Sequence, residues 1–182
     1  FTDISNYISY ETGQPTHCYD FSCVNEPIKL NFLQKDCEFN TLLDKNILIK
    51  KGDLVFCDKD DNVINLAGIV GGKNTACKDN TKSVIVECAS FNPEVILGKS
   101  IKYDINSDAA HKFERYVDPL CHDFVLRRFL QIVGEHCNIK NVELFKEVSK
   151  EEDKNLIEFD HNKINEILGT EIDHTKCISY LK

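Results

Sequence analysis

The sequence contains no methionine and no tryptophan. We interpret a chain of 182 residues that begins with Phe1 and lacks methionine as a piece of a longer polypeptide. Its length is sufficient for one sizeable domain, or for one domain together with a fragment of another.

Positive charge is scarce, since 22 Lys and Arg face 30 Asp and Glu and the net charge is -8. A free-standing nucleic-acid-binding domain needs a clustered basic surface to contact phosphates, so this class of protein is excluded. Any contact with RNA is therefore expected to be local, or shared with other domains.

Long apolar runs are missing as well. No run approaches the roughly 20 residues that a membrane-spanning helix needs, and no signal-peptide pattern is present. We expect a cytoplasmic protein that does not contact a membrane.

Nine cysteines are present, but no two form a Cys-x-x-Cys pair. Structural zinc sites use ligands roughly two to four residues apart, and an odd number does not suit a complete disulfide framework. We therefore expect reduced, mostly buried thiols and no metal site.

Hydrophobic periodicity predicts an α+β fold of mixed or antiparallel sheets flanked by helices. Alternating or continuous apolar segments bounded by turns predict short strands. These are residues 28–32, 37–42, 47–49, 54–57, 63–70, 83–89, 142–145 and 156–159. Helical spacing and capping residues predict helices. These are residues 3–10, 93–102, 117–136, 162–168 and 173–182.

The distribution of charge predicts two parts. Residues 1–148 form the main domain, the charged stretch 149–155 is a linker, and residues 156–182 begin a small, truncated second domain.

The polar segment Ser107–Pro119 opens one predicted helix and leads into another. Ser107 or Asp108 offers an N-cap oxygen, and Asp118-Pro119 suits the start of the next helix. So dense a group of charges is either a solvated helix surface or the wall of a site.

Glu87 is the most informative single residue because it interrupts the apolar run 83–89. A buried charge must be paired, hydrogen-bonded or neutralised, so a role in a site and a structural salt bridge both remain open. His17 follows the helix stop Gly13-Gln14-Pro15 on a predicted loop, where it is a candidate for handling a proton or a water. Gly71 allows either a close approach to its backbone or a simple turn.

Four strings in order resemble the beta subunit of bacterial-type phenylalanine--tRNA ligase. They are Ser5–Tyr7 with Glu11–Asp20, Leu66–Gly72, Val86–Phe91 and Ser107–Pro119. The tail, with residues 162–169, looks like the start of the next small domain of that subunit.

The resemblance implies an editing domain that hydrolyses tyrosine wrongly attached to tRNA(Phe). By residue-by-residue match it implies that Glu87 recognises the tyrosine hydroxyl and that His17 is the editing-site histidine. It further implies a catalytic hydroxyl at Ser107 and a substrate pocket lined by Gly71, Ala109 and Asn6.

The resemblance also implies partners: the 3' end of tRNA(Phe), and an alpha subunit in a heterotetramer of two alpha and two beta subunits. ATP and magnesium would serve the whole enzyme, and no cofactor or metal is expected in this fragment. Three positions depart from the family pattern: Tyr116 replaces glycine, Cys18-Tyr19 replaces alanine and phenylalanine, and Ser107 replaces threonine.

Two other interpretations remain open. The domain could brace the beta subunit and position tRNA without catalysis, its editing pocket having decayed. It could also be an unrelated small-molecule hydrolase.

Overall fold

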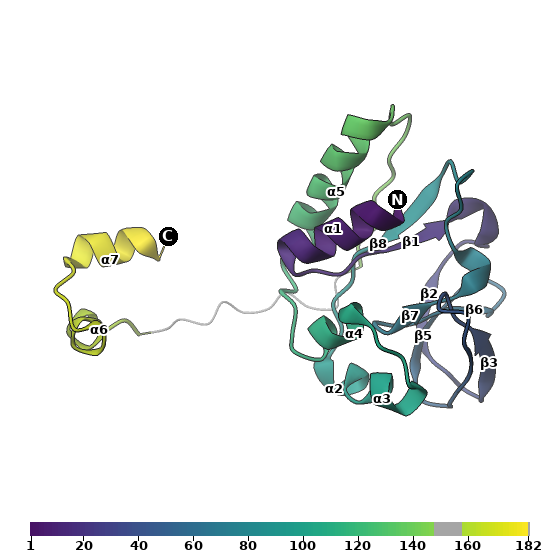
Figure 1. Cartoon of the computed structure of the whole chain (residues 1–182), viewed down its shortest axis with the longest axis horizontal. Helices are drawn as coiled ribbons and strands as arrows, with labels where there is room; N and C mark the ends of the chain where they lie inside the picture. The colour runs from purple at the N-terminus through teal and green to yellow at the C-terminus, as the bar shows by residue number, and fades with distance from the viewer. Residues whose placement is uncertain (148–157, 182) are drawn as a thin grey trace. The chain divides into compact units, whose positions relative to one another are not determined.

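The computed structural model describes residues 1–147 and 158–181 (Figure 1). It divides into two compact units, Phe1–Asn141 and Val142–Lys182. The predicted linker 149–155 lies outside the described residues. The described half of the predicted strand 156–159 has no regular secondary structure.

In the described residues, one α-helix comes first, the short strands follow, and the remaining α-helices come after the last strand. The α-helices are α1 (Thr2–Thr12), α2 (Pro93–Ile96), α3 (Lys99–Tyr103), α4 (Asp108–Phe113), α5 (His122–His136), α6 (His161–Leu168) and α7 (His174–Tyr180). The strands are β1 (His17–Asp20), β2 (Lys29–Phe32), β3 (Cys37–Asn40), β4 (Asn46–Ile49), β5 (Leu54–Cys57), β6 (Val63–Leu66), β7 (Val70–Gly71) and β8 (Val84–Glu87). Two single-turn 3₁₀ helices are η1 (Phe21–Cys23) and η2 (Lys73–Thr75).

The strands of the first unit form three antiparallel groups. The order β2-β5-β6-β7 makes a four-stranded sheet, β3 and β4 form a hairpin, and β1 pairs with β8. The predicted α+β class with antiparallel sheets is confirmed.

Local capping explains where several helices begin. Ser107 Oγ accepts a hydrogen bond from the amide of Ala110 at 3.3 Å, and Asn92 caps α2 through the amide of Glu94 at 3.0 Å. The predicted N-caps at these two positions are therefore confirmed.

Five local predictions were wrong. The predicted strand 63–70 is two antiparallel strands, β6 and β7, because the chain turns back at Gly68, which adopts φ 71°. His17 lies on β1 rather than on a loop, because β8 supplies a partner strand that local sequence does not reveal. Residues 93–102 form two helices separated at Gly98, which adopts φ 75°. Asp118 caps a turn by accepting from the amide of Leu120, so α5 begins only at His122. Residues 142–145 are not a strand, and their apolar side chains are exposed.

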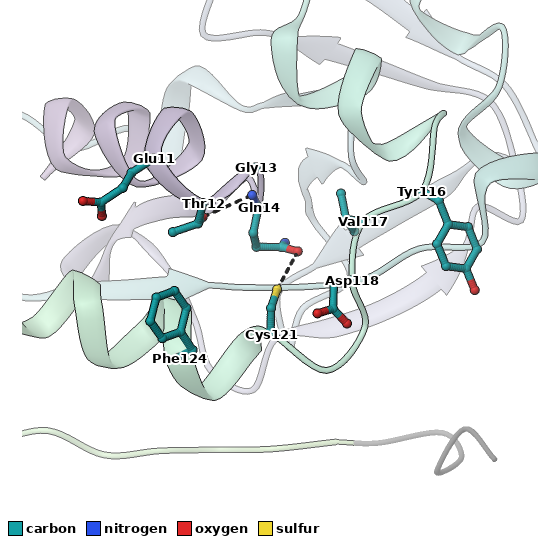
Figure 2. Close-up of a pocket in the computed structure, with 9 residues that line it drawn as sticks. All are labelled: Glu11, Thr12, Gly13, Gln14, Tyr116, Val117, Asp118, Cys121 and Phe124. Carbon is teal, nitrogen blue, oxygen red and sulfur yellow. Dashed lines mark hydrogen bonds between the residues drawn. The ribbon is translucent and has the colours of Figure 1, made fainter. Parts of the chain in front are cut away.

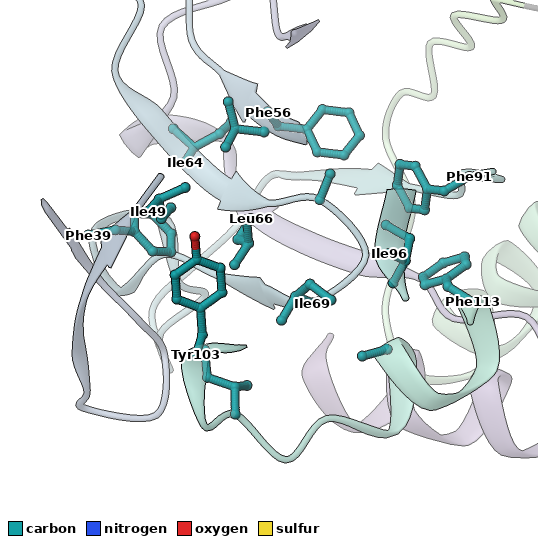
Figure 3. Packing of buried hydrophobic residues seen from close by; sticks show 14 of the residues in the cluster. Phe39, Ile49, Phe56, Ile64, Leu66, Ile69, Phe91, Ile96, Tyr103 and Phe113 are labelled. Atoms are coloured by element: carbon teal, nitrogen blue, oxygen red, sulfur yellow. The ribbon is translucent and has the colours of Figure 1, made fainter. Parts of the chain in front are cut away.

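The strand β1 lies between two hydrophobic cores. Tyr19 belongs to the main core. This core contains side chains from β5, β6, α2 and α4, among them Phe56, Leu66 and Phe113 (Figure 3). Cys18 belongs to the second core, in which α1 packs on α5. Successive side chains of a strand point to opposite faces, so this one short strand contributes side chains to both cores.

All nine cysteines carry free thiols. Only Cys18, Cys57 and Cys177 are buried, so the prediction that most are buried was wrong. Among the described residues, no group of three or more His, Cys, Asp or Glu could hold a metal ion. No described helix is both long and apolar enough to span a membrane.

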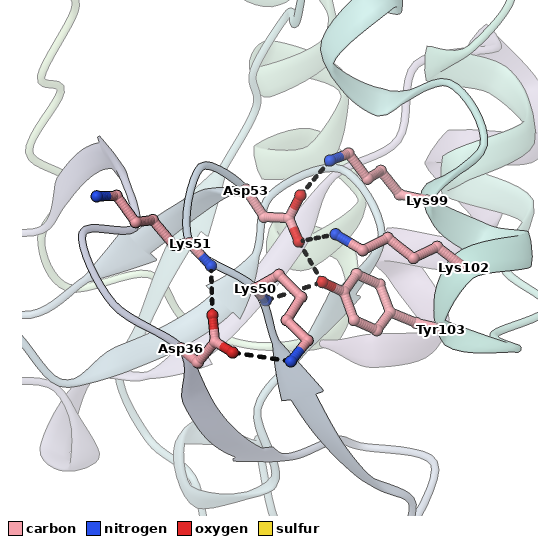
Figure 4. Close-up of polar contacts among 7 residues, drawn as sticks. All are labelled: Asp36, Lys50, Lys51, Asp53, Lys99, Lys102 and Tyr103. Atoms are coloured by element: carbon pink, nitrogen blue, oxygen red, sulfur yellow. Dashed lines mark hydrogen bonds and ion pairs between the residues drawn. The ribbon is translucent and has the colours of Figure 1, made fainter.

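Asp53 joins the sheet to α3 through a buried carboxylate whose side chain is 2% exposed. It accepts hydrogen bonds from Lys99, from Lys102 at 2.7 Å and from the hydroxyl of Tyr103 (Figure 4). Burial alone would raise the pKa of Asp53, but the bonds from Lys102, Lys99 and Tyr103 outweigh it and lower that pKa. The ionised carboxylate therefore stabilises the fold.

We expect Asp53→Asn to lower the free energy of unfolding by about 2 kcal/mol at neutral pH, because charge-assisted hydrogen bonds are lost. The folded-state pKa of Asp53 lies below its unfolded value near about 4, so its contribution is complete above that value and disappears as the pH falls further. Urea unfolding of parent and variant between neutral and acidic pH measures this. Asp61→Asn, at an exposed carboxylate, is the control and should change stability little. A difference for Asp53→Asn that persists in acid would contradict this account.

Tyr116 adopts φ 78°, in the left-handed region that favours glycine. A side chain there costs roughly 1–2 kcal/mol. The resemblance described above implies glycine at this position, and the backbone adopts a conformation that suits glycine.

Tyr116→Gly is expected to be more stable than Tyr116→Ala by about 1 kcal/mol, because both variants lose the ring but only glycine relieves the strain. The midpoints of urea unfolding compare the two variants directly. Equal stability would mean that the backbone at position 116 is not strained.

Candidate functional site

The pairing of β1 with β8 brings together residues that are far apart in the sequence. His17 lies opposite Glu87, and Tyr19 lies opposite Ile85. His17 and Tyr19 share one face of β1, so Tyr19 is a diagonal neighbour of Glu87.

The carboxyl group of Glu87 accepts a hydrogen bond from a tyrosine hydroxyl within the protein. Tyr19 donates to Oε2 of Glu87, and Asn65 Nδ2 donates to the Tyr19 hydroxyl at 2.9 Å and approaches the same Oε2 at 3.5 Å. Burial raises the pKa of Glu87 to about 7, although the bond from Tyr19 acts in the opposite direction. Near neutral pH this carboxyl is therefore present in both its protonated and its ionised form.

The sequence left open a role in a site and a structural salt bridge for Glu87, and the described structure contains no such salt bridge. No described Lys, Arg or His forms a salt bridge with Glu87, so its charge is accommodated by hydrogen bonds and by protonation. The apolar run 83–89 suggested a buried strand, but the residues of β8 are only half-buried, because β8 pairs only with β1 in the described structure.

His17 presents a neutral imidazole in an apolar setting. Burial lowers its pKa to about 4, and its ring meets the Tyr19 ring edge-on with centroids 4.5 Å apart. Its Nε2 is buried and has no hydrogen-bond partner among the described residues. A neutral imidazole with a spare ring nitrogen can hold a water or a hydroxyl group.

Gly71 makes room for that imidazole. A Cβ built at position 71 would overlap Cε1 of His17 and lie 2.5 Å from its Nε2. Gly71 also pairs with Asn65 across β6 and β7. His17, Tyr19, Asn65, Gly71 and Glu87 thus form one group, which we name the Glu87 cluster.

The other predicted site residues are held differently. Ser107 caps α4, and Ala109 packs against the same main core as Tyr19. Asn6 is exposed on α1, next to Ser5, whose hydroxyl donates to the carbonyl of Thr16 at 2.6 Å. No described hydrogen bond joins Ser107, Ala109 or Asn6 to the Glu87 cluster, and their roles stay predictions.

Sequence reasoning missed Asn65 and Gln14, and it noted Tyr19 only as a departure from the family pattern. Gln14 is 1% exposed, and its amide donates to the carbonyls of Pro15 at 2.9 Å and Ala89 at 2.8 Å. It therefore ties the start of β1 to the end of β8. A polar amide inside the apolar run 63–70 was the signal that could have identified Asn65.

A cavity of about 570 Å³ lies between the end of α1 and the start of α5 (Figure 2). The loop before α5 contributes Tyr116 and Asp118, and Cys121 donates to Gln14 Oε1 at 3.5 Å. None of the predicted site residues lines this cavity.

Gly71→Ala is expected to lower the free energy of unfolding by about 1–3 kcal/mol, because the new methyl group overlaps the buried ring of His17. In a His17→Ala background, Gly71→Ala should lower the free energy of unfolding much less. Urea unfolding of the parent, the two single variants and the double variant measures the coupling energy between positions 17 and 71. Gly134→Ala is the control: only Ile139 lies near its Cβ position, at 3.9 Å. If the effects of Gly71→Ala and His17→Ala on the free energy of unfolding were additive, the close approach of the His17 ring to Gly71 would be contradicted.

Comparisons with known proteins give consistent matches. The model of a family described as the B3/4 domain matches residues 1–138. The phenylalanine--tRNA ligase beta subunit of Francisella tularensis subsp. tularensis is 31% identical over 187 residues, which cover 100% of this chain and 23% of that protein. The same subunit of Colwellia psychrerythraea is 39% identical over 137 residues, which cover 72% of this chain and 17% of that protein.

The chain thus spans about a fifth of the length of the curated relatives it matches. A solved N-terminal fragment of the phenylalanyl-tRNA synthetase beta subunit from Pyrococcus horikoshii aligns with a TM-score of 0.47 and 13% identity, covering 94% of this chain and 51% of that one. The family model and the sequence relatives identify the family without this structural alignment. The chain belongs to the B3/4 domain family, and its resemblance to the beta subunit of bacterial phenylalanine--tRNA ligases is confirmed.

Proposed function

We propose that this chain is the editing domain of a phenylalanine--tRNA ligase beta subunit and that it hydrolyses tyrosine wrongly attached to tRNA(Phe). One observation carries the proposal. The half-buried carboxyl of Glu87, which accepts a phenolic hydroxyl group, lies beside a neutral imidazole with a spare nitrogen.

The chemistry explains why a second site is needed. Tyrosine differs from phenylalanine by one hydroxyl group, and an apolar pocket rejects an added hydroxyl only about 10²-fold. A site that hydrogen-bonds the hydroxyl can discriminate by about 10⁴-fold or more. Glu87 supplies an acceptor for that bond, and its surroundings contain no described cation that would hold the carboxylate elsewhere.

In the proposed reaction, water attacks the carbonyl carbon of the ester at the 3' end of the tRNA. The ester C–O bond breaks, the ribose oxygen gains a proton, and free tyrosine leaves. His17 orients the water or the terminal ribose hydroxyl through Nε2, since a pKa of about 4 makes it a weak base at neutral pH. Ser107, Ala109 and Asn6 are proposed to border the aminoacyl group.

The proposal extends to partners that belong to the whole protein. An alpha subunit would complete a heterotetramer, and that assembly would use ATP and magnesium for aminoacylation. The net charge of -8 means that most contacts with tRNA phosphates would come from other domains or from the alpha subunit.

A second candidate is a non-catalytic domain that braces the subunit. The observation in its favour is that the Tyr19 hydroxyl already occupies Oε2 of Glu87. Hydrolysis assays decide between the two functions.

We expect Glu87→Ala in the assembled enzyme to lower the ratio of kcat/KM for tyrosyl-tRNA(Phe) over phenylalanyl-tRNA(Phe) by roughly tenfold or more, because a phenol contact of about 1–3 kcal/mol is lost. His17→Ala should instead lower kcat for both esters. Deacylation of each labelled aminoacyl-tRNA measures these constants.

Glu38→Ala, at an exposed glutamate on β3, is the matched control and should behave as the parent. If Glu87→Ala and the parent hydrolyse both esters at equal rates, Glu87 is not the phenol receptor. If the parent hydrolyses neither ester, the bracing function is the correct one.

A further inference from the structure

We propose that Tyr19 lowers the selectivity of the editing site, because its own hydroxyl keeps Glu87 hydrogen-bonded when a phenylalanyl ester is bound. This inference rests on the proposed function, since it concerns the selectivity of the same site. It assigns Tyr19 a positioning role that acts through Glu87.

The internal tyrosine is fixed in place. Tyr19 is fully buried in the main core, and its ring packs edge-on against His17. Its hydroxyl donates to Glu87 Oε2 and accepts from Asn65 at 2.9 Å, so both of its polar partners are provided by neighbouring strands. A side chain held in this way remains bonded to Glu87 whichever ester arrives.

A site selects for a hydroxyl group largely because a ligand without that group leaves a buried acceptor of the protein without a hydrogen bond. If Glu87 lacked Tyr19, a phenylalanyl ester would bury the carboxyl group with no phenolic hydrogen bond at either oxygen, and this cost would reject that ester. In this chain Tyr19 keeps Oε2 hydrogen-bonded at all times. A phenylalanyl ester then leaves only Oε1 without a partner, so the cost is smaller and that ester is rejected less strongly.

The second oxygen of Glu87 can accept a further hydrogen bond. Among the described residues, hydrogen bonds reach only Oε2 of Glu87. A carboxylate has acceptor positions on both oxygens, so Oε1 can accept the phenol of a tyrosyl ester while Oε2 stays with Tyr19. Tyr19 thus permits recognition of the tyrosyl ester but reduces the preference of the site for the tyrosyl over the phenylalanyl ester.

The test is Tyr19→Phe in the assembled enzyme, which removes only the hydroxyl and keeps the packed ring. We expect the ratio of kcat/KM for tyrosyl-tRNA(Phe) over phenylalanyl-tRNA(Phe) to rise about tenfold. Most of the change should be a higher KM for the phenylalanyl ester. A loss of packing alone would lower both rates and would not raise the ratio.

Tyr103→Phe is the matched control, because Tyr103 is also a buried tyrosine that donates to a carboxylate, Asp53, in a different part of the fold. It should lower stability without changing the ratio. In a Glu87→Ala background, Tyr19→Phe should leave the ratio unchanged, because no hydrogen-bond acceptor remains at position 87.

An unchanged or lower ratio in Tyr19→Phe, while Glu87→Ala still loses discrimination, would overturn this inference and leave the proposed function standing. A Glu87→Ala enzyme with parental discrimination would overturn both. Unfolding midpoints measured on the same preparations show whether each variant has kept its fold.

Discussion

The pairing of β1 with β8 is the contact on which the rest of the first unit depends. It joins residues 17–20 to residues 84–87, and the intervening chain forms the four-stranded sheet and the β3–β4 hairpin. Because β1 faces one core with Tyr19 and the other with Cys18, the same four residues connect both cores. Loss of this pairing would separate His17 from Glu87 and expose part of each core.

Burial at this pairing has opposite effects on the pKa values of two opposed residues. It raises that of Glu87 to about 7 and lowers that of His17 to about 4. Both shifts favour the uncharged form, as expected where water is partly excluded. The result at neutral pH is a neutral imidazole opposite a carboxyl group that is present in both protonation states.

Local sequence was sufficient for the elements that depend on local forces. α1 and α5 follow from helical periodicity, and α4 follows from its Ser107 cap. Glu87 could be identified because a charge within an apolar run requires a partner. The partner itself could not be identified, since Tyr19 is 68 residues away and meets Glu87 only through strand register. The strand at His17 was missed for the same reason.

Among the described residues, two carboxylates accept the hydroxyl of a buried tyrosine, and their difference separates a structural role from the proposed functional one. Asp53 bonds Tyr103 and is also surrounded by Lys99 and Lys102, so its pKa is lowered and its charge stabilises the fold. Glu87 bonds Tyr19 without a described cation, and burial raises its pKa to about 7. A carboxylate with a purely structural role would stabilise the fold more if a lysine lay next to it. The absence of one around Glu87 in the described structure leaves an acceptor whose bonding a substrate phenol can still change.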